Sequence, residues 1–188
     1  MKNENRPYSI EVHRFRSAAW AASTAASASP KCRFKVEIGT NILENSNCEK
    51  YANGWNELPT ADEFDEKHLQ QCLLIQEKAR DLGVMGFSFG VSAKLFNCYL
   101  KTLFLGGINA DLTDEQMRKR DAIHPPIDRV LLEGLAKKKI GDVNWRKFAN
   151  DAWSTYDEDK YKKVIGAIRS CFPNTPLWQV EYYWKGHQ

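Results

Sequence analysis

The stretch that decides the fold runs from Gly90 to Lys101 and reads GVSAKLFNCYLK. Drawn as a helix through Phe104, it is apolar almost all the way round, so we expect it in the interior of the protein. Its polar side chains, Lys94, Asn97 and Lys101, fall within roughly 60° of one another on that helix. A buried ammonium group without a partner is costly. Lys94 is therefore expected to reach solvent, to meet a carboxylate or to line a cleft.

The composition of the chain narrows the class of protein. With 188 residues, 43% of them hydrophobic, it can form a core that needs no disulfide or metal for support. A net charge of +3 gives no overall field of the kind that marks a strongly basic nucleic-acid binder, although local clusters could still supply one. No run approaches the roughly 18 apolar residues of a membrane-spanning helix, so we expect no membrane partner.

The cysteines and histidines give no sign of a metal site or of a disulfide framework. The five cysteines are scattered without a C-x-x-C pair, and the four histidines lack the spacing of metal ligands. We therefore predict no metal, no cofactor and a reducing, cytoplasmic location.

Helix start signals recur along the chain and predict a mainly α-helical protein. Ser9 is a candidate N-cap, and Thr60–Glu63, Thr113–Gln116 and Thr155–Glu158 have the spacing of capping boxes. Together with the apolar periodicity, these signals predict helices over 9–28, 60–82, 90–104, 114–120, 126–135, 145–153, 155–172 and 177–184. Apolar and polar residues alternate at Arg33–Ile38, which makes this segment the best strand candidate, and at most one short strand region is expected. Because a lone strand is marginally stable, an extended segment or a helical turn is the alternative there.

The expected architecture is a compact multi-helix orthogonal bundle that forms a single domain over 1–188. Residues 45–59 have the asparagine, glycine and proline content of a loop, which allows two small lobes, 1–58 and 59–188. Two such lobes would share a cleft.

The second informative stretch, His124 to Arg129, reads HPPIDR and opens a helix. Proline is tolerated in the first turn of a helix. The carboxylate of Asp128 is favourable there simply through the helix dipole. One open interpretation is therefore structural: Asp128 starts a helix, and a salt bridge to Lys94 ties two helices together without any chemistry.

The two stretches together resemble the core of the helix-hairpin-helix DNA glycosylases. The likeness is greatest to the lysine-bearing 8-oxoguanine type, whose pattern is a Gly-Val-Gly-x-Lys hairpin, a helix, and Val-Asp before the next helix. Here the matching residues are Gly90-Val91-Ser92-Ala93-Lys94 and Pro126-Ile127-Asp128-Arg129. The match covers about twenty residues in two blocks. The chain departs from the pattern at Ser92, which replaces the second glycine, and in the 34 residues (128 − 94) that separate the lysine from the aspartate.

The resemblance implies a helix-hairpin-helix element, double-stranded DNA as the partner and a base-excision reaction with strand cleavage. Lys94 would attack the sugar carbon and form a Schiff base, and Asp128 would stabilise the positive charge that develops. Free amides of Gly90, Val91 and Ser92 would bind a phosphate oxygen. The side chains of Lys101 and Arg129 are further candidates for DNA contacts.

A flipped base would enter the cleft and stack on aromatic rings. Phe87 and Phe89 are the nearest candidates for that role, although both also fit a hydrophobic core. Asn97 and His124 would flank the site as polar support.

Two other functions fit the same residues. The chain could be a non-catalytic helical accessory or protein-interaction protein in which the Lys94–Asp128 pair is structural. It could also be a DNA-binding module that kept the hairpin and lost the chemistry.

Overall fold

The computed structural model describes residues 7–27, 31–107 and 111–186, and this part of the chain is mainly helical, as predicted. The α-helices are α1 (Ile10–Ala26), α2 (Val36–Asn45), α3 (Phe64–Asp81), α4 (Phe89–Phe104), α5 (Asp114–Ala122), α6 (Arg129–Lys137), α7 (Trp145–Asn150) and α8 (Glu158–Cys171). Short 3-10 helices join them: η1 (Cys48–Asn53), η2 (Trp55–Glu57), η3 (Trp153–Thr155) and η4 (Leu177–Tyr183). Within the described ranges, no helix is both long enough and apolar enough to cross a membrane.

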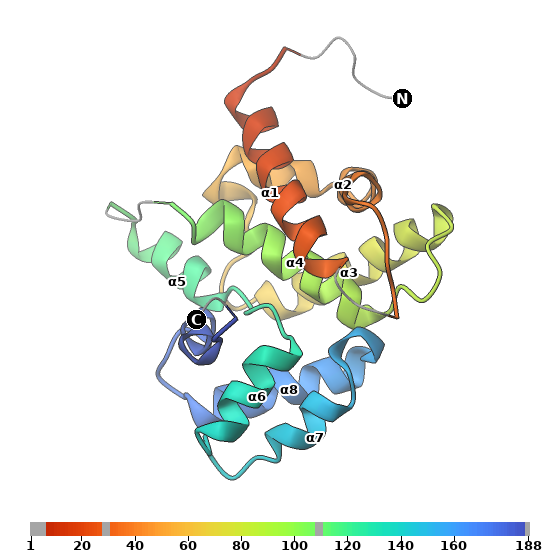
Figure 1. Ribbon diagram of the computed structural model, residues 1–188. Coiled ribbons are helices and arrows are strands. Elements are labelled where there is room, and N and C mark those ends of the chain that lie inside the picture. The colour runs from red at the N-terminus through yellow and green to blue at the C-terminus, as the bar shows by residue number, and fades with distance from the viewer. Residues whose placement is uncertain (1–6, 28–30, 108–110, 187–188) are drawn as a thin grey trace.

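Helix α4 is the centre of the fold (Figure 1). Twelve of its sixteen residues are buried, which confirms that this stretch belongs in the interior. α1 packs along it, and α3, α8 and η3 also contact it. The extensive contact between α1 and α4 joins the segment before residue 58 to the rest of the core. In Figure 1, α6, α7 and α8 gather below α4.

Local start signals explain where several helices begin. The Ser9 hydroxyl accepts the Val12 N–H at 3.4 Å at the start of α1, as predicted. Thr113 and Gln116 form the predicted reciprocal capping box of α5, with side-chain to backbone distances of 3.0 and 3.2 Å. α1 ends at Ala26 with Ser27 as its C-cap, and the last residue of the predicted range, 28, lies outside the described residues.

The strand interpretation of Arg33–Ile38 is wrong and the alternative of a helical turn is confirmed, because α2 begins within this segment at Val36. The alternation that suggested a strand is too short to exclude a helix, whose buried face continues at Ile42 and Leu43. Gly39 lets α2 approach α1 closely: a Cβ atom at this position would overlap the Ser23 side chain.

Four other predictions differ in detail from the structure. Thr60 bonds the Glu63 carboxylate at 2.8 Å, but α3 begins only at Phe64, so that pair does not cap it as a box. Asp157, rather than Thr155, caps α8, and its carboxylate accepts the Lys160 N–H at 2.8 Å. The segment 177–184 is a tighter 3-10 helix rather than an α-helix, and the loop expected at 45–59 contains η1 and η2.

Candidate functional site

The structure brings Lys94 and Asp128 together. Lys94 Nζ lies 3.0 Å from Asp128 Oδ2, and the two side chains are only 10% and 13% exposed. Lys94 comes from the central helix α4, whereas Asp128 is the N-cap of α6, where its Oδ1 accepts the Leu131 N–H at 2.9 Å. One carboxylate therefore starts a helix and neutralises a nearly buried ammonium group.

Two tryptophans complete the surroundings of this pair. The Trp153 ring, in η3, has its centre 4.5 Å from Lys94 Nζ, a cation–π contact. The Trp184 indole N–H, just after η4, donates to both Asp128 oxygens at 3.1 and 3.0 Å. We call Lys94, Asp128, Trp153 and Trp184 the charged cluster. Because its members come from four segments, the tertiary fold sets its geometry.

The Lys94–Asp128 pair lines a pocket of about 210 Å³. This volume is below the roughly 300–1,000 Å³ of sites for drug-sized ligands, so the pocket suits a group the size of one base or sugar. Its lining comes from α1, α4, the start of α6 and the C-terminal segment: Ala21, Ala25, Lys94, Cys98, Lys101, Thr102, Pro126, Asp128, Glu181 and Trp184. The small alanines of α1 leave this space open.

Side chains of both charges line the pocket. Lys101 forms an ion pair with Glu181 beside the Lys94–Asp128 pair. Burial raises the pKa of the Glu181 carboxyl, although Lys101 opposes that shift. Burial also raises the pKa of Cys98 to about 11, so this thiol is protonated at neutral pH and contributes a neutral wall.

The prediction of free amides at Gly90, Val91 and Ser92 is wrong. Gly90 lies inside α4, and its N–H donates to the Tyr156 carbonyl at 3.0 Å. The Val91 and Ser92 amides donate to the Ser88 hydroxyl and carbonyl at 3.2 and 3.1 Å. All three residues are buried. None of these amides can bind a phosphate without losing its protein partner.

Gly90 instead permits a close packing contact. A Cβ atom on Gly90 would overlap the carbonyl oxygen of Trp153, so only glycine lets η3 lie against α4. This contact helps to place the Trp153 ring over Lys94. The turn between α3 and α4 lies earlier, in 82–88, where Gly83 and Gly86 have positive φ. That this turn belongs to a helix-hairpin-helix element stays a prediction.

Phe87 and Phe89 belong to the hydrophobic core and do not line the Lys94 pocket. The Phe87 ring packs against Phe34, and the Phe89 ring packs against Tyr161. The interpretation that both rings belong to the hydrophobic core is therefore confirmed, and neither is a stacking ring at the Lys94 pocket. Trp153 and Trp184 are the aromatic side chains at the pair, and sequence reasoning missed both because they follow Lys94 by dozens of residues.

Asn97 and His124 do not line the pocket either. Both are buried in a neighbouring hydrogen-bonded network with His68 and Tyr161, which we call the neutral cluster. His68, Tyr161 and His124 face a second pocket, of about 220 Å³. Burial lowers the pKa of both histidines, that of His68 to about 3, so both rings are neutral at pH 7.

The two predicted surface contacts lie in different settings. Lys101 lines the pocket in its ion pair with Glu181. The Arg129 side chain is 70% exposed and bonds Glu133 at 2.6 Å, one turn further along α6. Both side chains are accessible enough to meet a partner, but only Lys101 lines the pocket, whereas Arg129 follows the lining residue Asp128 in the chain.

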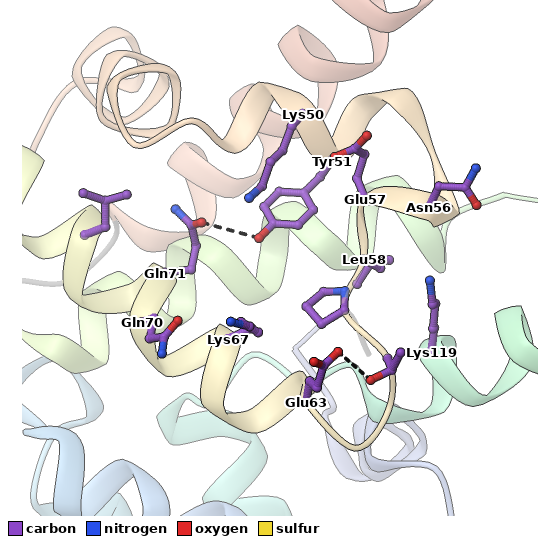
Figure 2. A pocket seen from close by; sticks show the side chains of 13 residues that line it. Lys50, Tyr51, Asn56, Glu57, Leu58, Glu63, Lys67, Gln70, Gln71 and Lys119 are labelled. Carbon is purple, nitrogen blue, oxygen red and sulfur yellow. Dashed lines mark hydrogen bonds between the residues drawn. The ribbon is translucent and has the colours of Figure 1, made fainter.

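A larger groove, of about 660 Å³, lies elsewhere, between η1, η2, α3 and α5 (Figure 2). Figure 2 shows Lys50, Lys67 and Lys119 around it together with Glu57 and Glu63. The groove contains none of the predicted site residues. Volume alone therefore does not point to the predicted site.

The chain was compared with known proteins at the level of families, sequences and structures. No family model, curated protein or solved structure matches it. Among the residues that the structure describes, no group of three or more histidine, cysteine, aspartate or glutamate side chains could hold a metal ion. What points to a function is therefore the short sequence resemblance and the geometry at Lys94.

Proposed function

We propose that this protein binds double-stranded DNA and excises a damaged base, with Lys94 as the nucleophile and Asp128 as its partner. One observation carries the proposal: two residues 34 positions apart, singled out by their motif, meet at 3.0 Å in the wall of a base-sized pocket. A structural ion pair has no need of a cavity beside it.

The proposed reaction begins with a proton transfer from Lys94 Nζ to Asp128 Oδ2. The free amine then attacks C1′ of the flipped nucleotide, and the bond from C1′ to the base breaks. The base leaves with that electron pair and takes up the proton. Asp128, again a carboxylate, then takes one proton from the Nζ that is now bonded to C1′. The lone pair of this nitrogen forms the C=N bond as the bond from C1′ to O4′ breaks, O4′ leaves with that electron pair and takes up the proton from Asp128, and a protonated Schiff base remains on Lys94. The Asp128 carboxylate stabilises this cation.

The surroundings of the pair suit this chemistry. A nearly buried ammonium–carboxylate contact is only weakly screened by solvent. The Trp184 indole and the Leu131 N–H fix the Asp128 carboxylate, so it need not reorient during the reaction. The Trp153 ring lies where it can support a cation at Nζ.

DNA contacts would differ from those of the glycosylases that the chain resembles. Because the amides of Gly90 to Ser92 are used inside the protein, phosphate contacts would fall to side chains. Lys101 and Arg129 are the candidates. Such contacts position a duplex without reading its sequence.

The test is borohydride trapping on duplexes that carry 8-oxoguanine or an abasic site. The expected result is a covalent protein–DNA adduct, mapped to Lys94 by mass spectrometry. Lys94→Gln should give no adduct. An adduct on another lysine, or none with any damaged base, would overturn the proposal.

Lys119 offers a matched control. Its side chain is also only 9% exposed and paired, 3.4 Å from Glu115, but it does not line the Lys94 pocket. Lys119→Gln should therefore trap DNA as the unsubstituted protein does. Equal loss in both variants would point to general damage to the fold rather than to a nucleophile.

A second candidate is a non-catalytic accessory protein in which the pair ties α4 to α6. Its specific support is the complete satisfaction of Asp128 by Lys94, Trp184 and Leu131. This candidate predicts no trapping and no DNA binding at low salt. Salt-sensitive DNA binding without trapping would instead favour a module that has lost the chemistry.

A further inference from the structure

Asn97 connects the two chain segments that carry the reactive pair. It lies on α4 three residues after Lys94, and its Nδ2 donates to the Pro125 carbonyl at 2.9 Å. Pro125 comes three residues before Asp128. Because Pro125 and Pro126 have no N–H groups, these two residues cannot donate backbone hydrogen bonds of their own. The Asn97 bond is therefore a direct tie between the Lys94 helix and the Asp128 segment.

The orientation of the Asn97 amide is fixed by its neighbours. Asn97 Oδ1 lies 2.6 Å from His68 Nε2, and Nδ2 also donates to the Tyr161 hydroxyl at 2.9 Å. A flipped amide would place its N–H groups against a donor and its oxygen against the Pro125 carbonyl. Only the observed orientation satisfies every partner.

The same chain of hydrogen bonds continues to the residue before Pro125. His124 Nε2 lies 2.9 Å from Asp65, which as a carboxylate can only accept, so this nitrogen carries the ring proton. His124 Nδ1 then accepts from the Tyr161 hydroxyl at 2.9 Å. Arg169 holds the Asp65 carboxylate through two N–H groups. Both His124 and Pro125 are thus anchored to helices other than α6, the helix that Asp128 caps.

We infer that Asn97 is a positioning residue: by clamping Pro125 to α4, it sets the contact between Lys94 Nζ and Asp128. Its consequence for catalysis rests on the proposed function, whereas its consequence for the Lys94–Asp128 pairing does not. The structure contains a matched comparison in Gln71. This buried amide also donates to a backbone carbonyl, that of Ser46, at 2.8 Å, but it lies in a separate network.

The first experiment measures Lys94 without DNA. Reductive methylation with formaldehyde and cyanoborohydride, read by mass spectrometry of the peptide that contains Lys94, reports how well the pair shields this amine. Asn97→Ala should speed Lys94 labelling on the order of tenfold, the change expected for one lost buried hydrogen bond. Gln71→Ala should label Lys94 at the unsubstituted rate. Equal labelling in both variants would overturn the inference.

The second experiment uses the trapping reaction at saturating damaged duplex. Asn97→Ala should slow trapping on the order of tenfold with unchanged DNA affinity, whereas Gln71→Ala should do neither. Unchanged trapping in Asn97→Ala would overturn the catalytic part of the inference. If the unsubstituted protein traps no DNA, the proposed function fails, and the labelling result still decides whether Asn97 positions the pair.

A milder variant keeps the test decisive if Asn97→Ala does not fold. Asn97→Ser retains a hydroxyl for one neighbour, but its shorter side chain does not span the distance to the Pro125 carbonyl. It should therefore raise Lys94 labelling in the same direction. Unchanged labelling in a folded Asn97→Ser protein would also contradict the inference.

Discussion

The charged cluster and the neutral cluster each contain a residue of α4, but their buried polar groups are stabilised in different ways. They face pockets of similar volume, about 210 and 220 Å³. In the charged cluster an ammonium group and a carboxylate stay in contact beside a pocket. In the neutral cluster, burial keeps both histidines uncharged, and donors and acceptors alternate from His68 to His124. The second pocket also has an ion pair in its wall, Asp65 with Arg169, but those side chains are about half exposed. The comparison teaches that a nearly buried ion pair, rather than pocket size, marks a candidate reactive site.

The largest effect on stability is expected for Gly90→Ala, which would disturb the charged cluster. The added methyl group would overlap the Trp153 carbonyl, push η3 from α4 and separate the Trp153 ring from Lys94. We expect a loss of about 3 kcal/mol or more in the free energy of unfolding, measured by urea denaturation. As a control, Gly166→Ala lies in α8 with open space at its Cβ and should be stabilising by roughly 0.5–1 kcal/mol. Equal effects in both would contradict the tight contact.

Tyr161→Phe breaks the neutral cluster and removes no side-chain contact of the four residues in the charged cluster. It leaves His124 Nδ1 without a donor and removes one acceptor of the Asn97 amide. We expect a loss of about 2 kcal/mol, the cost of buried groups left unpaired. The matched control is Tyr182→Phe, because that ring is 73% exposed, and its effect should stay within roughly 0.5 kcal/mol. A Tyr161→Phe variant with an unchanged free energy of unfolding would show that these hydrogen bonds add nothing to stability.

The next effect is expected when the pH is lowered, because the two histidines of the neutral cluster should then reduce the free energy of unfolding. Burial lowers the folded pKa of His68 to about 3 and lowers that of His124, against an ordinary value near 6.5 in the unfolded chain. Their contribution is therefore complete above pH 6.5 and is lost as pH falls below it, by about 1.4 kcal/mol per pH unit for each histidine that protonates only on unfolding. Unfolding in urea between pH 7.5 and 4.5 measures this slope. His68→Gln should make it shallower, and an unchanged slope would contradict the assignment.

The smallest effect on stability is expected for Arg129→Gln, at the residue that follows Asp128 in the chain. The Arg129–Glu133 pair is exposed, so its loss should cost less than about 0.5 kcal/mol. If Arg129 contacts a phosphate of the duplex, the plot of the logarithm of the DNA-binding constant against the logarithm of the salt concentration should become less steep by about 1 in this variant. Glu133→Gln, which removes the partner charge, should not reduce that slope. An unchanged slope for Arg129→Gln would place the DNA elsewhere.

The part of the site that local chemistry controls was predictable from the sequence. Apolar residues all round the 90–104 helix placed it in the core, and the HPPIDR stretch marked Asp128 as a helix start. Because an unpaired buried charge is costly, Lys94 and Asp128 were expected to pair with each other. Their contact at 3.0 Å confirms the convergence, while the catalytic roles stay predictions.

The part that tertiary packing controls was not predictable. The sequence marks Gly90 as a helix-start glycine, but only the fold shows that the Tyr156 carbonyl takes its amide and that Trp153 covers its Cα. The place of Trp184 depends in the same way on the path of the last segment. The strand interpretation of Arg33–Ile38 was wrong for another reason, because a few alternating residues fit a strand and the first turn of a helix equally well.

The double duty of Asp128 has a practical consequence for mutagenesis. Alanine at this position would remove the negative charge and also the cap of α6, so a loss of activity could come from a frayed helix end. Asparagine is about as good an N-cap as aspartate, and its side-chain oxygen can still accept the Leu131 N–H. Asp128→Asn therefore keeps the cap of α6 while it removes the negative charge and the Oδ2 acceptor that Lys94 and Trp184 use, and it separates the loss of these contacts from the loss of the helix start.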